Sequence, residues 1–199
     1  MGNSRALRSL ISRHVIPDLD QVGFDGRWPH YARAVGERLD TVAFWGYRGQ
    51  YFIDLGVDFA FLYQRKRRWR KNLDVTAWSA EFRGRLKPPG AHDFAFPYGA
   101  SRAEAEVAVA NMRNLFASAG LGFFNRFEPM PAAVRSVTPT QLIRDPNSIS
   151  DLGTGARLCL VLARIWEHYD DPERSVRFAR KGLILTRFRG HRDCAANAA

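Results

Sequence analysis

The chain has little cysteine, with Cys159 and Cys194 as the two residues of this type. Two cysteines cannot form the disulfide framework of a small secreted protein, so they favour a reducing compartment. Long apolar runs are missing as well. The longest, at 158–163, is far below the ~18 residues that span a membrane, and the charged start of the chain does not fit a secretory signal. We therefore expect a cytoplasmic protein without a transmembrane segment.

Sequence motifs for catalysis and metal binding are also missing. There is no GxSxG nucleophile motif, and the glycines around Thr154 lack the lysine and the preceding strand of a phosphate-binding loop. Cys159 lies in an apolar stretch and is expected to be a small core residue. The histidines have no paired spacing typical of metal ligands: His14, His30, His92, His168 and His191. We expect no metal and no other cofactor, and we favour a protein that is not an enzyme.

Acidic residues are too few to balance the basic ones, which leaves a formal charge of +10 and a pI near 10.3. Such a charge attracts polyanions, whether nucleic acid, anionic lipid or an acidic protein surface, without distinguishing among them. Most of the basic residues are arginine. An Arg-rich and Ala-rich composition is also what a high-GC bacterial genome produces without selection for binding, so both explanations of the charge stay open.

Core-forming residues, by contrast, are plentiful: 46% of the chain is hydrophobic and 13% is aromatic, enough for one folded domain. From Trp28 the apolar residues alternate, which predicts strands in HYARAV, LDTVAFWGY and YFIDLGVDFAFLY, and a fourth strand within VTAWSAEFRGRL. In the third strand, the odd-numbered residues 51–61 share one apolar face and the even-numbered ones share the other. The pattern predicts a half-buried antiparallel meander of about four strands.

Helical spacing predicts the other elements. A helix of about five turns is expected from a cap at Asn3 or Ser4 to a stop at Gly23. We expect it to bend at Pro17, because proline removes a backbone donor. A later helix is expected from a cap at Ser101 to a stop at Gly120. A further short helix is expected to begin at Thr138.

Two helices over 155–169 and 172–185 are predicted to form an αα-hairpin that looks like one tetratricopeptide-type unit. One such unit cannot bury both of its faces, so we expect it to dock on the rest of the chain. The predicted fold class is α+β: an antiparallel sheet packed by an N-terminal helix and a later helix, with a C-terminal αα-hairpin. The predicted organisation is an α+β domain over 1–150, the docked hairpin over 151–186 and a flexible tail over 187–199.

Four stretches, taken in order, are similar to a known family: IPDLDQVGF after the first helix, VAFWGYRGQYFIDLGV, EFRGRL, and a helix that ends in LFASAGLGFFNRF. Over most of its length the chain thus resembles an uncharacterised bacterial family, domain of unknown function 4304. The resemblance implies the fold and a bacterial cytoplasmic origin. It implies no activity and no site residues, and the chain departs from the family in a basic insertion at 65–71.

This insertion, which we call the basic segment, is the candidate binding site. It consists of Arg65, Lys66, Arg67, Arg68, Trp69, Arg70 and Lys71. Cations neutralise phosphates and an aromatic face stacks on any base, so the segment could bind nucleic acid without sequence preference. Clustered charge at a sheet edge can also serve another purpose, which is to prevent the edge strand from pairing with a strand of another molecule.

A second group of cations recurs along the last predicted helix and the tail: Arg174, Arg177, Lys181, Arg187, Arg189 and Arg192. Cations near a helix C-terminus stabilise the helix dipole, so this group need not bind anything.

For function we favour a non-catalytic bacterial accessory protein that binds another protein or a polyanion. Nucleic-acid binding through the basic segment is the first alternative. The second is an enzyme that uses Asp54 and Asp58, which share a strand face and could act as an acid–base pair. These two carboxylates could instead pair with Arg83 or Arg85 on a neighbouring strand.

Overall fold

The computed structural model describes residues 4–63, 76–91, 93–151 and 153–196, with the backbone alone for Ser4, Tyr63, Pro146 and 187–196. The strands are β1 (Asp25–Arg27), β2 (His30–Val35), β3 (Arg38–Tyr47), β4 (Gln50–Phe59), β5 (Phe82–Arg85) and β6 (Phe96–Pro97). The helices are α1 (Ser4–Leu10), α2 (Ile16–Gln21), α3 (Ala60–Tyr63), α4 (Arg102–Leu115), α5 (Leu121–Asn125), α6 (Pro139–Arg144), α7 (Gly155–His168) and α8 (Pro172–Ala196).

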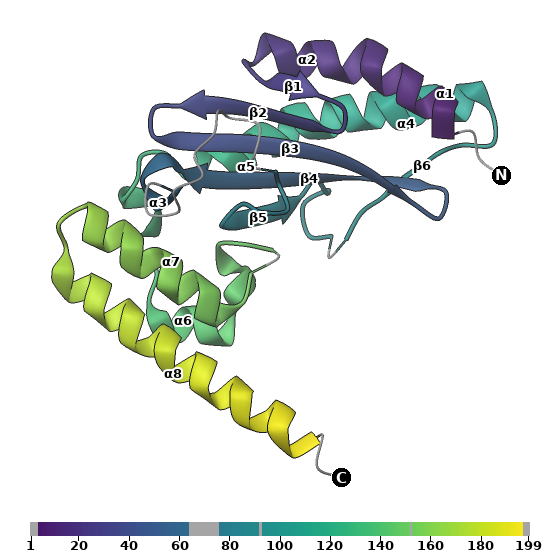
Figure 1. The fold of residues 1–199 in the computed structure, drawn as a ribbon. Helices are drawn as coiled ribbons and strands as arrows, with labels where there is room; N and C mark the ends of the chain where they lie inside the picture. The colour runs from purple at the N-terminus through teal and green to yellow at the C-terminus, as the bar shows by residue number, and fades with distance from the viewer. Residues whose placement is uncertain (1–3, 64–75, 92, 152, 197–199) are drawn as a thin grey trace.

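The strands form one antiparallel sheet in the order β1-β2-β3-β4-β5, and β6 pairs with the start of β4. In the view of Figure 1, α1, α2 and α4 lie above the sheet, and α6, α7 and α8 form a group below it. The predicted α+β class is confirmed. The described chain has two more strands than predicted, because β1 and β6 have three and two residues and are too short to show alternation.

Strand β4 is buried at every position after Gln50, so the prediction of a half-exposed sheet is wrong for this strand. Its odd-numbered residues 51–59 join the hydrophobic core together with residues of α1, α4 and α5. Its even-numbered face is covered too, because the turn at 76–80 lies on it: a Cβ added to Gly56 would meet Ala77 and Ala80 within 3 Å. The same turn explains why β5 begins only at Phe82.

Two π-helical turns carry the chain past the predicted helix breakers. Ile11–Val15 connects α1 to α2, and it places Pro17 in the first turn of α2, where a missing N–H costs little. Phe116–Gly120 likewise connects α4 to α5, so Gly120 does not end the helix. The Phe116 ring packs where a Cβ of residue 120 would lie, which explains the glycine there.

The two C-terminal helices form the predicted αα-hairpin, and Asp171 caps α8 by accepting a hydrogen bond from the Arg174 N–H at 3.0 Å. Helix α7 lies between α8 and the sheet (Figure 1) and buries seven of its 14 side chains. Helix α8 continues to Ala196, past residue 186 where the hairpin was predicted to end. Arginine and alanine, both good helix formers, are frequent in this last part.

The close approach at Gly56 predicts a stability effect. We expect Gly56→Ala to lower the free energy of unfolding by about 1–3 kcal/mol, because its Cβ would lie 2.5 Å from Thr41 Oγ1 and 2.6 Å from the Ala80 Cβ. The matched control is Gly122→Ala in α5, where the added methyl group meets nothing within 4 Å. That change should stabilise the protein by about 0.5–1 kcal/mol. Denaturant unfolding measures both, and equal effects would contradict the prediction.

Candidate functional site

The basic segment lies outside the described residues, so the structure does not place the binding residues predicted from the sequence. The chain on either side of it is well packed. Before it, Phe61 of α3 stacks face to face on His168 of α7, with 3.8 Å between the ring centroids. After it, the turn at 76–80 lies on the even-numbered face of β4.

Asp54 is the centre of a polar cluster on that face of the sheet. Its Oδ2 accepts hydrogen bonds from Trp45 Nε1 at 2.8 Å and Trp78 Nε1 at 2.9 Å. Its Oδ1 accepts one from Arg85 Nε at 3.0 Å, and Arg85 also binds Asp93. The pairing of Asp54 with Arg85 was one of the structural explanations offered by the sequence. The cluster ties together β3, β4, β5 and the turn at 76–80.

His30 lies in the same transverse row of the sheet as Asp54, because His30 pairs with Ala43 and Ala43 pairs with Asp54. Its ring contacts the Trp78 ring edge to face, with 5.1 Å between centroids. Its Nδ1 is buried and has no hydrogen-bond partner among the described residues. Burial lowers the pKa of His30 from its ordinary value of 6.5, which favours the neutral ring.

Asp58 belongs to a different cluster, although it shares the sheet face with Asp54. It accepts hydrogen bonds from the backbone N–H groups of Phe59 at 2.8 Å and Glu81 at 3.2 Å. Four residues of strand separate the two aspartates by about 13 Å, whereas paired catalytic carboxylates stand about 5–9.5 Å apart. The structure therefore gives each of these carboxylates its own donors and does not bring them to a common point.

A buried charge cluster that the sequence analysis missed lies on the opposite sheet face. Asp40 is fully buried and contacts Arg33 Nε at 2.9 Å and Arg38 Nε at 2.8 Å. Burial raises the pKa of Asp40, and the two guanidinium groups oppose this effect. Arg38 also binds Glu128 at 3.0 Å, beside a small hollow of about 120 Å³. The hairpin register, which sets Arg33 opposite Asp40, was the signal that could have revealed the pair.

Helix α8 carries an outward surface, which we call the α8 face: Val176, Arg177, Arg180, Leu183 and Ile184. The exposed fractions of its aliphatic side chains are 46% for Val176, 54% for Leu183 and 46% for Ile184. The predicted cationic strip is not a single surface, since Arg174 turns inward and lies over the Trp166 ring at 4.5 Å.

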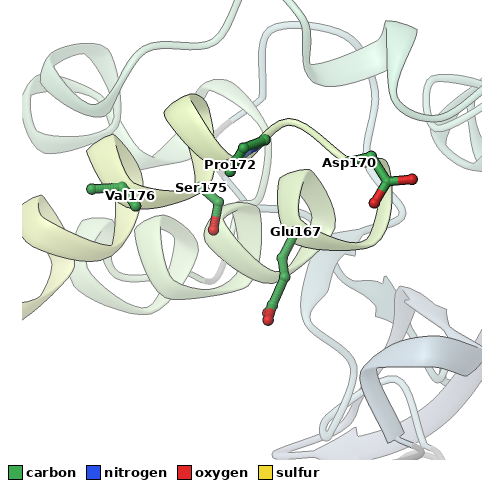
Figure 2. Close-up of a pocket in the computed structure, with 5 residues that line it drawn as sticks. All are labelled: Glu167, Asp170, Pro172, Ser175 and Val176. Carbon is green, nitrogen blue, oxygen red and sulfur yellow. The ribbon is translucent and has the colours of Figure 1, made fainter.

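A pocket of about 460 Å³ adjoins the start of the α8 face, where α7 turns into α8. Figure 2 shows the side chains that line it, which come from both sides of the turn: Glu167, Asp170, Pro172, Ser175 and Val176. Val176 belongs both to the pocket and to the α8 face, so the two features form one continuous surface.

In the described part of the chain, no group of three or more His, Cys, Asp or Glu side chains is arranged to hold a metal ion. Cys159 is buried in α7, as predicted, and burial raises its pKa to about 11, which disfavours the reactive thiolate. None of the helices within the described ranges has the length and apolar character needed to cross a membrane.

Comparisons with protein-family models, with curated proteins and with solved structures find no match for this chain. The resemblance to domain of unknown function 4304 therefore stays a prediction.

The Asp54 cluster predicts that its charge is structural. Asp54→Asn keeps the shape but turns one acceptor atom into a donor that faces Trp or Arg N–H groups. We expect it to lower the free energy of unfolding by about 2–3 kcal/mol. Glu106→Gln removes an exposed ion pair with Arg102 and should cost at most about 0.5 kcal/mol. Denaturant unfolding followed by tryptophan fluorescence measures both, and a loss for Asp54→Asn as small as that for Glu106→Gln would refute this role.

Proposed function

We propose that this is a non-catalytic bacterial cytoplasmic protein that binds another protein through the α8 face. The observation that carries the proposal is the exposure of three aliphatic side chains beside Arg177 and Arg180 on the outermost helix. Of the seven large apolar side chains that are exposed in the described chain, Val176, Leu183 and Ile184 lie together on α8. Apolar side chains gathered on one face mark interaction sites more often than single exposed ones do.

The packing of the hairpin supports this proposal. Helix α7 covers the inner side of α8, where Phe178 is buried and where a Cβ at Gly182 would meet Leu160 and the Ala156 carbonyl. Helix α8 has 25 residues and α7 has 14, so at 1.5 Å per residue α8 is about 16 Å longer. The outward side of α8 has no covering element in the described chain and is available to a partner.

The chemistry of the interior supports a non-catalytic role. Asp54 and Asp58, the candidate acid–base pair, are held by separate sets of donors. Cys159 is buried. These groups stabilise the fold, and a partner on the α8 face would not contact them.

Site-specific crosslinking tests this proposal. With a photo-crosslinking amino acid in place of Leu183, we expect a discrete protein adduct in native cells. In place of Val107, which is 60% exposed on α4, we expect none. The captured protein should bind the purified chain, and Leu183→Gln with Ile184→Gln should weaken that binding by about tenfold or more, since hot-spot truncations commonly cost more than 1 kcal/mol. If position 183 gives no adduct, or the same adducts as position 107, the proposal fails.

Nucleic-acid binding through the basic segment is the second candidate. Residues 64–75 contain six cations and one acid and therefore carry half of the net charge of +10. Phosphate binding releases counterions, so affinity would fall steeply with salt. Replacing Arg67, Arg68 and Arg70 with alanine should make the dependence of the binding constant on salt less steep. On duplex DNA, the magnitude of the slope of the logarithm of the binding constant against the logarithm of the salt concentration should fall by about 2.7. Gel shifts over a series of salt concentrations measure this slope. The absence of a shift with both DNA and RNA at low salt would exclude the candidate.

A further inference from the structure

We infer that the partner segment that covers the α8 face is an acidic amphipathic helix. This inference rests on the proposed function and names the chemistry of the partner. It follows from the spacing of the apolar residues, from the charges beside them and from the poor fit of the other possible occupants.

The spacing of the exposed aliphatic residues is that of a helix–helix contact. Leu183 and Ile184 follow Val176 by seven and eight positions, so the three side chains lie along one stripe of α8. Such a stripe is about 12 Å long at 1.5 Å per residue, which is slightly more than two turns of a partner helix. The partner is therefore expected to place apolar residues at i, i+3, i+4 and i+7 against it.

The charges beside the stripe require an acidic partner. Arg177 and Arg180 are exposed next to the aliphatic residues, and within the described residues neither takes part in a salt bridge. By sequence, residues 172–196 hold seven Lys or Arg and two acidic residues. At about 100° per residue, Arg180 lies between Val176 and Ile184 around the helix. Arg177 lies at the edge of the stripe next to Ile184. A helix with carboxylates along its apolar stripe would pair with these arginines and bury Leu183 together with its neighbours.

A second copy of the same helix fits poorly, because it would bring a net charge of about +5 against an equal charge. Nucleic acid fits poorly too. The aliphatic side chains of the α8 face have no ring on which a base could stack, and phosphates would pair with the arginines but leave the stripe uncovered.

A designed peptide tests the inference. The probe is a fluorescent helix of about three heptads, with Leu or Ile at the a and d positions and Glu at e and g. Its control is a scrambled peptide of the same composition, which keeps the charge and loses the stripe. We expect fluorescence anisotropy to show that the native protein binds the amphipathic peptide at least about tenfold more tightly than the scrambled one.

Variants separate the two contributions. Leu183→Gln with Ile184→Gln removes apolar surface without changing the charge, and Arg177→Gln with Arg180→Gln removes charge without changing the stripe. Each pair should weaken binding of the amphipathic peptide by about tenfold, and the control Val107→Gln should leave it unchanged. Circular dichroism and thermal unfolding confirm that the variants fold. Equal affinity for both peptides, or full binding by either double variant, would overturn the inference.

Three further measurements address the other occupants. Binding to phosphatidylserine vesicles tests a lipid surface as the occupant, and binding to duplex DNA tests nucleic acid. Sedimentation of the protein alone tests a second copy of the chain. If the native protein binds vesicles, binds DNA or forms a dimer, and the double variant Leu183→Gln with Ile184→Gln does not, the α8 face binds the lipid, the DNA or the second copy. The inference of an acidic helix would then be overturned. If crosslinking at position 183 captures a protein and the acidic peptide does not bind, the proposed function survives and this inference fails. If neither occurs, both fail.

Discussion

The burial of both faces of the central strands is the constraint on which the rest of this fold depends. A carboxylate on a doubly covered strand must receive donors, because an unpaired buried charge is costly. Asp54 receives them from Trp45, Trp78 and Arg85, and Asp58 receives them from the backbone. These donors come from separate parts of the chain, so satisfying each charge also fixes where the turn at 76–80 and strand β5 must lie.

The same principle fixes the C-terminal hairpin. Glu81, next to that turn, is buried and accepts a hydrogen bond from Arg157 Nε of α7 at 2.9 Å. Arg157 also donates to the carbonyls of Ser79 and Ala80. Helix α7 is thus tied to the sheet by a polar contact at its start and by the stack of Phe61 on His168 at its end. With α7 fixed at both ends, α8 is left on the outside.

The sequence predicted those features that depend on local patterns. Strand β2, the capped starts of α4 and α6, the αα-hairpin and the buried Cys159 follow from alternation, capping residues and helical spacing. Burial of the even-numbered face of β4 could not be predicted, because the turn that covers it is distant in sequence. The π-helical turns were missed for another reason: Pro17 and Gly120 are breakers by propensity, and one extra residue per turn removes the conflict.

In the candidate site too, the sequence predicted what depends on local patterns and missed what depends on packing. Alternation placed Asp54 and Asp58 on one strand face, which is correct, but alternation cannot say which donors reach them. The positive charge of the last helix was evident from the sequence, yet its direction depends on packing: Arg174 lies on Trp166, and Arg177 stays outside. Composition therefore identified a basic helix, and only the docking of α7 determines which of its cations a partner can reach.

The arrangement of charges also bears on the selectivity that we propose for the α8 face. Arginines inside the fold, such as Arg38 and Arg85, are matched by the chain's own acids, so the unmatched positive charge is concentrated at the surface. On α8 that charge lies among exposed aliphatic side chains. A purely polar polyanion would leave the aliphatic stripe uncovered, and a purely apolar surface would strip water from unpaired guanidinium groups at a high cost. The proposed partner of the α8 face would therefore have to satisfy both conditions at once, with apolar side chains and carboxylates on the same surface.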